Sequence, residues 1–279
     1  MLKEKVVVIT GAAGVICSEI ARDFASRGAF VVLVDLLVEN AEKLADKIRT
    51  EGGKCKCYAC DVTDKTAVDK LADEVIANHG RCDILINGAG GNSAKAQPKI
   101  IKFDPRELED DRPEDIVGIY NVDMEAFEGV LRLNTMGTVY PLLAFAKYMV
   151  KQGGGNIVNF ASMNTYCPLT RNFAYAMAKA AVANFTQAFA AYFAESGIRI
   201  NAVAPGFILN PRSRLILGTV EEGLTKRGKD VIDHTPMGKF GTANDICGCV
   251  RWLVDDTSSG FVTGITVPVD GGFLTLSGV

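Results

Sequence analysis

The sequence is poor in the features that mark nucleic-acid partners, membrane anchors and secretion. Its 30 lysines and arginines are outnumbered by 33 aspartates and glutamates, so there is no basic excess to attract a polyanion. No run of 18 apolar residues occurs, and the apolar stretch before Gly11 is too short for a secretory signal. We therefore expect a cytoplasmic protein that binds neither nucleic acid nor a membrane.

Histidine is scarce, and the cysteines are poorly spaced for metal binding. Only two histidines accompany the eight cysteines. If Cys55, Cys57 and Cys60 lie on one strand, the first two point to one face and the third to the other, so the three thiols cannot converge. Without an export signal, eight cysteines indicate reduced thiols in a reducing compartment. We expect no metal site.

The sequence does contain a regular alternation of short apolar runs and helix-length amphipathic stretches. This alternation is typical of βαβ units stacked into a parallel sheet flanked by helices, so the expected fold class is α/β, doubly wound and Rossmann-type. Seven runs, most of them rich in Val and Ile, are the predicted strands: residues 6–10, 30–35, 54–60, 84–87, 156–161, 199–204 and 266–269.

No repeat or low-complexity linker divides the chain, so residues 1–279 are expected to form a single dinucleotide-binding domain. Two irregular stretches interrupt the alternation. Residues 91–123 carry three prolines and an acidic run, and we interpret them as an elaborated crossover near the ligand end of the sheet. Residues 207–238 carry several basic side chains, and we interpret them as a substrate lid.

The first predicted strand leads into a turn of small residues that opens a helix. Gly11, Ala13 and Gly14 let backbone N–H groups approach a phosphate at the helix N-terminus, and Val15 and Ile16 follow them. Such a turn by itself also serves simple chain reversal, so the dinucleotide interpretation needs support from the strands that follow.

That support begins at Asp35, which ends the second predicted strand and can accept hydrogen bonds from an adenosine ribose diol. Neither Lys nor Arg occurs at residues 36–38, which begin with Leu36. A 2′-phosphate would therefore meet an unrelieved negative charge, so NAD is the expected cofactor. The alternative is that Asp35 only caps a helix.

Two further turns reach the same edge of the predicted sheet. Asp61 and Val62 follow the third strand, and Asn87, Gly88 and Ala89 end the fourth. Asp61 could accept a hydrogen bond from the adenine amine, and the small fourth turn would let the cofactor's ribose lie against the main chain. Ordinary turn chemistry is the alternative for both.

The second half of the chain carries residues suited to proton transfer. Tyr175 and Lys179 are four residues apart on an Ala-rich predicted helix, so they share one face, and Ser162 lies 13 residues before Tyr175. A phenol has a pKa of about 10, and this pKa must fall by roughly three units before the group can act as a base near neutral pH. The Lys179 charge and the positive nicotinamide ring could lower the pKa of Tyr175 in this way.

Taken together and in this order, these residues resemble those of a short-chain dehydrogenase/reductase over nearly the whole chain. The resemblance rests on Thr10-Gly11 with its loop, Asp61-Val62, Asn87-Gly88-Ala89-Gly90, Asn134, Ser162, Tyr175-xxx-Lys179 and Pro205-Gly206. It implies hydride transfer coupled to proton transfer, with NAD and without a metal.

The resemblance also implies a role for each residue. Tyr175 would be the general acid/base, Ser162 would hold the substrate oxygen, and Asn134 would support a water relay. Lys179 would lower the pKa of Tyr175 and, with Tyr175, contact the cofactor. The residues implied to border the nicotinamide carboxamide are Pro205, Gly206 and Ile208.

The sequence departs from the family pattern at several positions. Val15 and Cys17 stand where the family's loop usually has glycine, and Asn210 replaces the usual threonine after the Pro-Gly turn. Gly88 replaces the second asparagine of the usual Asn-Asn-Ala-Gly turn.

Within the family, the chain is similar to the D-mannonate oxidoreductase (fructuronate reductase) branch. The similarity rests on residues 14–17, 87–92, 162–164, 233–238 and 269–273. It implies a sugar acid, which needs a cation for its carboxylate and polar groups for its hydroxyls. The expected substrate-binding residues are Asn92, Ser162, Met163, Asn164, Tyr175 and Arg214, with Arg171 and His234 as further candidates. For His234, which precedes Pro236 by two residues, the favoured interpretation is a structural hydrogen bond or a helix cap.

Three alternatives stay open at this point. Another NAD-linked polyol or sugar-acid dehydrogenase, such as a gluconate 5-dehydrogenase type, would share the machinery. A 3-oxoacyl thioester reductase usually favours NADPH, which Asp35 opposes. A non-catalytic dinucleotide sensor would be expected to lose part of the catalytic set, whereas Asn134, Ser162, Tyr175 and Lys179 are all present.

The Ala-rich stretch 174–194 has a second possible use. Phe185, Phe189 and Phe193 recur every four residues and could pack into the core or form a contact between subunits. Because the family usually forms tetramers through such helices, the resemblance implies a homotetramer.

Overall fold

Seven parallel strands form the central sheet of the computed structural model, which describes residues 2–220 and 222–276. Their order is β3-β2-β1-β4-β5-β6-β9, which confirms the predicted doubly wound α/β fold. The predicted ends differ from the observed ones by at most one residue. The strands are β1 (Val6–Thr10), β2 (Phe30–Asp35), β3 (Lys54–Ala59), β4 (Ile84–Asn87), β5 (Gly155–Phe160), β6 (Ile198–Pro205) and β9 (Thr266–Val269).

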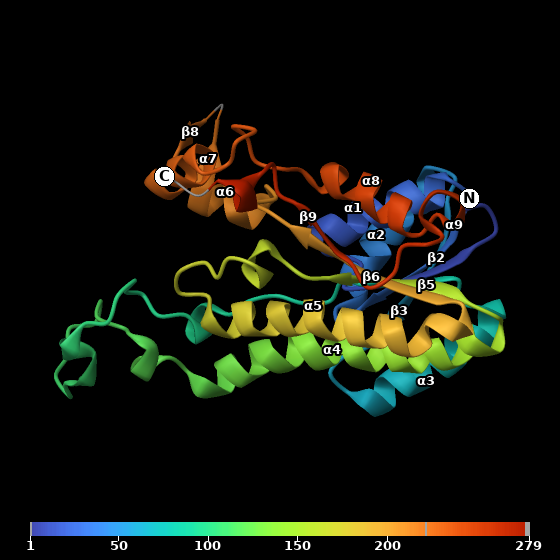
Figure 1. Cartoon of the computed structure of the whole chain (residues 1–279), viewed down its shortest axis with the longest axis horizontal. Coiled ribbons are helices and arrows are strands. Elements are labelled where there is room, and N and C mark those ends of the chain that lie inside the picture. The colour runs from blue at the N-terminus through green and yellow to red at the C-terminus, as the bar shows by residue number, and fades with distance from the viewer. Residues whose placement is uncertain (1, 221, 277–279) are drawn as a thin grey trace.

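Helices cover both faces of the sheet, as Figure 1 shows. Successive strand residues point to opposite faces, so Val7 and Ile9 pack with one set of helices and Val6 and Val8 with the other. One layer consists of α1 (Val15–Ser26), α2 (Val38–Thr50) and α8 (Ala243–Leu253). The other consists of α3 (Lys65–His79), α4 (Met124–Lys151) and α5 (Phe173–Phe193). The short helix α9 (Asp256–Ser259) follows α8.

Local capping chemistry fixes where several helices begin. Asp64 accepts hydrogen bonds from two backbone N–H groups in the first turn of α3, and Asp123 accepts one from Ala126 in the first turn of α4. Thr242 and Asp245 cap α8 reciprocally. These caps fix where the chain turns between the sheet and the outer layers.

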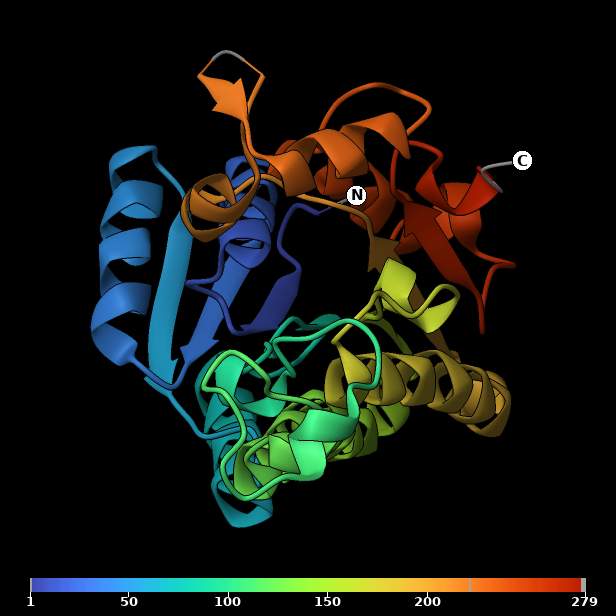
Figure 2. The ribbon, with the colours of Figure 1, turned by 90° about the vertical axis from the view of Figure 1, so that its left-hand side faces the viewer.

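The crossover, residues 91–123, contains no long helix. It includes three 3-10 helices: η1 (Ala94–Ala96), η2 (Pro105–Leu108) and η3 (Ile119–Asn121). Its start is tied to the loop before α5, because Asn92 and Gln97 both donate hydrogen bonds to the side chain of Asn172. The crossover therefore stands beside the carboxyl edge of the sheet, facing the viewer in Figure 2.

The lid, residues 207–238, lies across the same edge from the crossover (Figure 2). It holds α6 (Pro211–Leu217), the small strands β7 (Gly218–Thr219) and β8 (Gly223–Leu224), and α7 (Lys226–Asp233). Its two ends lie side by side: Gly241 donates to the carbonyl of Phe207 at 2.9 Å, and Leu209 donates to that of Gly241 at 2.8 Å. Leu217, Val231 and Phe240 give it a small core of its own.

All eight cysteines are free thiols; Cys55 and Cys57 pack on one side of the sheet and Cys60 on the other, as predicted. Within residues 2–220 and 222–276, no helix combines the length and apolar character needed to cross a membrane. Over the same residues, no group of three or more His, Cys, Asp or Glu side chains is arranged to hold a metal ion.

Candidate active site

Two adjoining cavities open at the carboxyl edge of the sheet, where the strand order reverses between β1 and β4. The larger, of about 530 Å³, is bounded by the turn after β1, the ends of β5 and β6, and α5. The smaller, of about 380 Å³, extends toward the ends of β2 and β3. The walls shared by both contain Gly11, Gly14, Gly88 and Gly90, so the two cavities form one elongated crevice.

The turn after β1 is folded tightly against the turn after β4. Gly11 has a φ of 62°, and a Cβ there would lie 2.8 Å from the Cα of Ala89, so only glycine fits this approach. The hydroxyl of Thr10 accepts a hydrogen bond from the Ala89 N–H at 3.2 Å. The chain then enters α1 at Gly14, whose neighbours Val15 and Ile16 line the larger cavity.

Asp35 ties the adenosine end of the crevice together. One carboxylate oxygen accepts from the N–H of Ala13 at 3.0 Å and the other from that of Leu37 at 3.1 Å. α2 starts at Val38 after Leu37 and has no side-chain cap, so the helix-cap alternative for Asp35 is wrong. Asp35 and Leu36 line the smaller cavity.

The predicted adenine-side residues divide into two groups. Asp61, Val62 and Ala89 line the smaller cavity, where Asp61 also accepts two hydrogen bonds from Thr63. Asn87 does not reach the crevice: its side chain is buried between strands and donates to Asn159 at 2.9 Å. The Asn87 side chain thus supports the floor of the crevice rather than lining it.

Ser162, Tyr175 and Lys179 line the larger cavity together. Ser162 follows β5, and its hydroxyl accepts hydrogen bonds from the backbone N–H and the side-chain amide of Asn164. Tyr175 and Lys179 come from successive turns of α5, with the Lys179 Nζ 5.5 Å from the centre of the Tyr175 ring. Lys179 is buried and donates to the Phe160 carbonyl at 2.7 Å.

Burial controls the charge of this group. It raises the pKa of Tyr175 above its usual value, and the nearby Ser162 hydroxyl offsets part of that rise. Burial also lowers the pKa of Lys179 to about 8. The expected lowering of the Tyr175 pKa by the Lys179 charge is absent, and the ammonium donates to the Phe160 carbonyl rather than to the phenol.

Asn134 connects the crossover to the catalytic group. Its side-chain amide donates to the carbonyl of Gly91 at 2.7 Å, and its oxygen accepts from the Gly91 N–H at 3.2 Å. A Cβ on Gly90 would lie 2.7 Å from that oxygen and 3.4 Å from the Lys179 Nζ. The glycine therefore permits Asn134 and Lys179 to lie against the same stretch of backbone.

The expected substrate residues are less well placed. Asn164 is buried, donates to the Ser162 hydroxyl and accepts from the N–H of Leu169, while Met163 is buried beside it. Asn92 is engaged with Asn172. Arg214 lies exposed on α6. Among the described residues that line the two cavities, these four do not occur.

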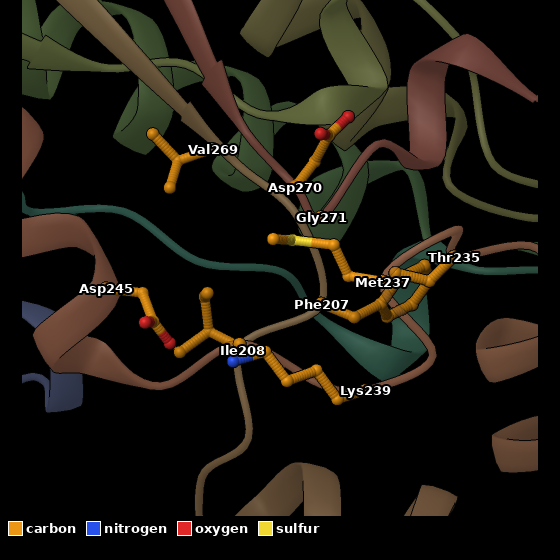
Figure 3. Close-up of a pocket in the computed structure, with 10 residues that line it drawn as sticks. Phe207, Ile208, Thr235, Met237, Lys239, Asp245, Val269, Asp270 and Gly271 are labelled. Atoms are coloured by element: carbon orange, nitrogen blue, oxygen red, sulfur yellow. The ribbon is translucent and has the colours of Figure 1, made fainter.

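A third cavity, of about 250 Å³, lies beneath the lid and behind Ile208. Figure 3 shows Lys239 and Asp245 reaching toward Ile208, with Thr235 and Met237 across the space. The Asp245 carboxylate caps α8, and hydrogen bonds from Thr242 together with the Lys239 charge lower its pKa. Because the Asp245 carboxylate and the Lys239 ammonium already interact within the protein, we do not interpret this cavity as a ligand site. We interpret it as space at the base of the lid.

Comparison with known proteins identifies the family. The model for short chain dehydrogenases matches residues 5–216. The chain belongs to the short-chain dehydrogenase family. An uncharacterized oxidoreductase of Haemophilus influenzae is 41% identical over 280 residues, spanning all of this chain and 96% of its own length.

Two solved structures of related dehydrogenases have the same fold. A candidate D-mannonate oxidoreductase of Haemophilus influenzae with bound NAD is 40% identical, with a TM-score of 0.92 over all of this chain and 98% of that chain. An NAD+-bound xylitol dehydrogenase is 29% identical, with a TM-score of 0.83 over 97% of this chain and 99% of that chain. The family membership makes this chain an oxidoreductase.

The departures of this short-chain dehydrogenase from its family pattern are physically linked. A Cβ on Gly88 would lie 2.0 Å from the Sγ of Cys17, so the thiol occupies the space that the usual asparagine would need. Cys17 is buried, and burial raises its pKa to about 12, which keeps the thiol neutral. Cys17 thus replaces a missing side chain in the crevice wall and is no nucleophile.

Sequence reasoning missed several lining residues of the dehydrogenase site. Asn40, on α2, and Leu133, on α4, face the smaller cavity, and neither stands in a motif. Pro205, Gly206 and Ile208 line the larger cavity as expected, and Asn210 lines it with them. In the sequence, Asn210 stands out only as a departure from the family pattern. Its position in the turn after β6 is the signal that could have placed it in the cavity wall.

Proposed function

We propose that this chain is an NAD(H)-dependent oxidoreductase that interconverts a secondary alcohol and a ketone of a sugar acid, with D-mannonate and D-fructuronate as the pair. One observation carries the proposal: Ser162, Tyr175 and Lys179 line the same crevice as the glycine turn and the end of β6. Proton-transfer groups and a phosphate-binding turn in one crevice are the requirement for this chemistry.

The shape of the crevice fits a dinucleotide. It runs from Asp35 and Asp61 at one end to Tyr175 and Lys179 at the other, over a glycine-lined wall beside the N-terminus of α1. When bound, NAD(H) supplies or accepts the hydride. Asp35 has lone pairs left for the ribose diol after its two backbone hydrogen bonds, and it opposes a 2′-phosphate.

The residues of the chain would then handle the proton and the substrate oxygen. The Tyr175 phenol donates a proton to the carbonyl oxygen in reduction and takes it back in oxidation. Ser162, which lines the same cavity as Tyr175, holds that oxygen in place. Lys179, charged below a pKa of about 8, lines the same cavity and would contact the cofactor. Asn134 fixes the backbone at Gly91, beside the route to the crossover.

A panel of substrates tests the proposal. Purified enzyme with NADH is expected to reduce D-fructuronate with a kcat/KM well above those for 5-ketogluconate and neutral ketoses. Turnover of 5-ketogluconate without turnover of D-fructuronate would replace the proposed substrate by that of a gluconate 5-dehydrogenase type. The likeness to the xylitol dehydrogenase makes neutral polyols the second class to include.

A second experiment distinguishes a catalytic enzyme from a non-catalytic dinucleotide sensor. Tyr175→Phe removes the proton donor and leaves the cavity wall intact, so NADH should still bind while turnover falls by about a thousandfold or more. Unchanged turnover would show that Tyr175 is not the acid/base. Activity of the wild-type enzyme itself excludes the non-catalytic sensor.

We further propose that the enzyme acts as a cytoplasmic homotetramer. The eight free thiols suit a reducing compartment. Phe189 and Phe193 are partly buried against the enzyme's own core, so the outer face of α5 is formed by other residues. That face carries a stripe of mostly small or apolar exposed side chains: Phe173, Met177, Ala180, Asn184, Ala188 and Ala191. Such a stripe suits close contact between two α5 helices.

A further inference from the structure

Asn164 lies against the Ser162 hydroxyl but does not line either cavity of the crevice. It is the middle residue of η4 (Met163–Thr165), the 3-10 helix that has Ser162 as its N-cap. Both residues are buried, each with 6% of its surface exposed. A polar side chain at this depth must find its hydrogen-bond partners inside the protein.

The Ser162 hydroxyl receives two hydrogen bonds from this one residue. The backbone N–H of Asn164 donates to it at 3.2 Å, and the side-chain amide nitrogen donates to it at 3.4 Å. A serine hydroxyl has two lone pairs and one hydrogen. Both lone pairs are therefore occupied, and donation of the O–H is the capacity that Ser162 has left for the crevice.

The loop that leads to α5 determines which end of the Asn164 amide faces Ser162. The backbone N–H of Leu169 donates to the Oδ1 atom of Asn164 at 3.0 Å. The oxygen of an amide can accept from an N–H but its nitrogen cannot, so Oδ1 faces Leu169 and Nδ2 faces Ser162. A backbone group thus fixes the direction of the hydrogen bond to the serine.

The loop itself, residues 166–172, is anchored on the crossover. The Asn172 N–H donates to the Leu169 carbonyl at 3.2 Å and closes a turn in which Arg171 is left-handed, with a φ of 68°. The Arg171 guanidinium, a candidate for substrate contact, instead donates to the Lys99 carbonyl at 3.2 Å. The side chain of Asn172 accepts hydrogen bonds from the crossover as well. The Leu169 N–H is therefore held from outside the crevice.

A serine hydroxyl with a free lone pair would compete for the reacting proton. The Tyr175 phenol could then donate its hydrogen to Ser162 instead of to the substrate oxygen. The occupied lone pairs exclude that arrangement and leave the reverse one, in which Ser162 is the donor. The Ser162 hydroxyl lowers the pKa of Tyr175 against the effect of burial, which is the direction that a donor to the phenolate produces.

We propose that Asn164 is a positioning residue that holds the Ser162 hydroxyl as a hydrogen-bond donor, so that the proton of the substrate alcohol can pass only to Tyr175. The inference rests on the roles proposed for Ser162 and Tyr175, and it replaces the expectation that Asn164 contacts the substrate.

In oxidation, the hydride leaves the carbinol carbon for NAD+ and the hydroxyl proton goes to the Tyr175 phenolate. Ser162 contributes a hydrogen bond and no proton. In reduction, the same donor stabilises the negative charge that develops on the substrate oxygen.

Asn164→Leu tests the inference, because leucine has a similar size and its side chain donates nothing. We expect the single-turnover rate of D-fructuronate reduction by NADH to fall about tenfold or more, with the Kd for NADH within about twofold of wild type. Asn164→Asp keeps the acceptor for the Leu169 N–H while its carboxylate cannot donate to Ser162. It should lose rate as well, and it takes the place of Asn164→Leu if that variant melts below the assay temperature.

Asn121, in the crossover, offers a matched control. Its side chain also bridges two groups: it accepts from the Gly118 N–H at 3.0 Å and donates to the Glu107 carbonyl at 2.9 Å. None of these three residues lines the crevice. Asn121→Leu should therefore leave the single-turnover rate within about twofold of wild type.

A double-mutant cycle separates positioning from a structural role. A residue that acts through the Ser162 hydroxyl has nothing to act on when the hydroxyl is gone, so Asn164→Leu should not slow the Ser162→Ala enzyme further. Damage to the fold or to the loop would lower the rate by the same factor in both backgrounds. Equal factors would overturn the inference.

The pH profile of D-mannonate oxidation with NAD+ gives a second readout. A serine that can accept from the neutral phenol stabilises the protonated form, so Asn164→Leu should move the limb governed by Tyr175 to higher pH. Lys179, an ionisable neighbour of Tyr175 on α5, is common to all the enzymes compared. A lower rate with an unmoved limb would indicate a structural role and overturn the inference.

The outcomes distinguish this inference from the proposed function. If Ser162→Ala slows the enzyme and Asn164→Leu does not, the inference is wrong and the function stands. If Ser162→Ala keeps the wild-type rate, the role proposed for Ser162 fails and the inference fails with it. If the wild-type enzyme reduces 5-ketogluconate instead of D-fructuronate, the named substrate is wrong, and the same comparisons with 5-ketogluconate decide the inference.

Discussion

Cys17 and Gly88 compete for the same space, and this pair shows how one residue can explain another. Viewed singly, each departs from the family pattern; viewed together, the thiol fills the room that a side chain at residue 88 would take. A buried side chain that would approach another to 2.0 Å cannot be accommodated without movement of the glycine turn or α1. The two positions should therefore depend on each other.

Gly88→Ala should lower stability by about 1–3 kcal/mol, the usual range for overpacking, and weaken NADH binding. Adding Cys17→Gly should restore part of both losses, because it removes the thiol. The recovery should be incomplete, because the Thr10 carbonyl still lies 2.9 Å from the new Cβ. Urea unfolding and NADH fluorescence titration of the two single variants and the double variant measure the coupling. Strictly additive effects would mean that the two residues are independent.

Lys179 offers a pH test at the same scale. Its pKa falls from 10.5 in the unfolded chain to about 8 in the fold, so the folded state binds fewer protons between these values and this residue's contribution to stability rises with pH there. At pH 7 the shift costs about 3 kcal/mol. Lys179→Met should therefore be more stable than wild type at pH 7 by up to this amount.

That difference should shrink as the pH rises from about 8 to 10.5, where the wild-type lysine becomes neutral in both states. Urea unfolding of both proteins at pH 7 and pH 10 provides the comparison. A stability difference that does not change with pH would indicate that Lys179 is not desolvated as the structure has it.

The strands and the lid differ in how far sequence could predict them. Every strand of the main sheet was predicted to within one residue at each end, and most of them are the continuous Val- and Ile-rich runs that buried parallel strands leave. The β7–β8 hairpin was missed, because two-residue strands leave no periodic pattern. The left-handed turn at Arg171 was also hidden, since no glycine marks it.

The site shows a similar division. The glycine turn, Asp35, and Tyr175 with Lys179 carry their spacing in the sequence, and all of them line the crevice. The inward direction of Asn87 and the outward direction of Arg214 depend on packing between elements, which a motif does not encode. Sequence could thus name the machinery better than the substrate contacts.

The end of β2 should determine which dinucleotide binds. Asp35→Ser combined with Leu36→Arg removes the carboxylate and supplies a cation for a 2′-phosphate, so the preference should shift from NADH toward NADPH. Affinity for NADH should fall as well, because Asp35 also holds the Ala13 N–H. Fluorescence titration with both cofactors measures the ratio, and an unchanged ratio would mean that Asp35 does not face the ribose.

At the scale of the whole molecule, the exposed stripe on α5 predicts how copies associate. Ala188 is exposed, so Ala188→Arg should leave the monomer folded while placing a charge in a close helix contact. Light scattering after size exclusion should show a tetramer for wild type and a smaller species for the variant. A tetramer in both cases would place the contact on another face.

The joined ends of the lid also bear on how such enzymes change their substrates. The segment leaves the sheet at Phe207 and returns beside it at Gly241. Its replacement by a segment from another dehydrogenase would disturb that short ladder of backbone hydrogen bonds and the ring contacts of Phe207 and His234 with Phe273. Hydride transfer and ligand choice can then change separately, because the first depends on the main sheet and its helices and the second on the lid. A graft of this kind should alter what the enzyme reduces while sparing how it does so.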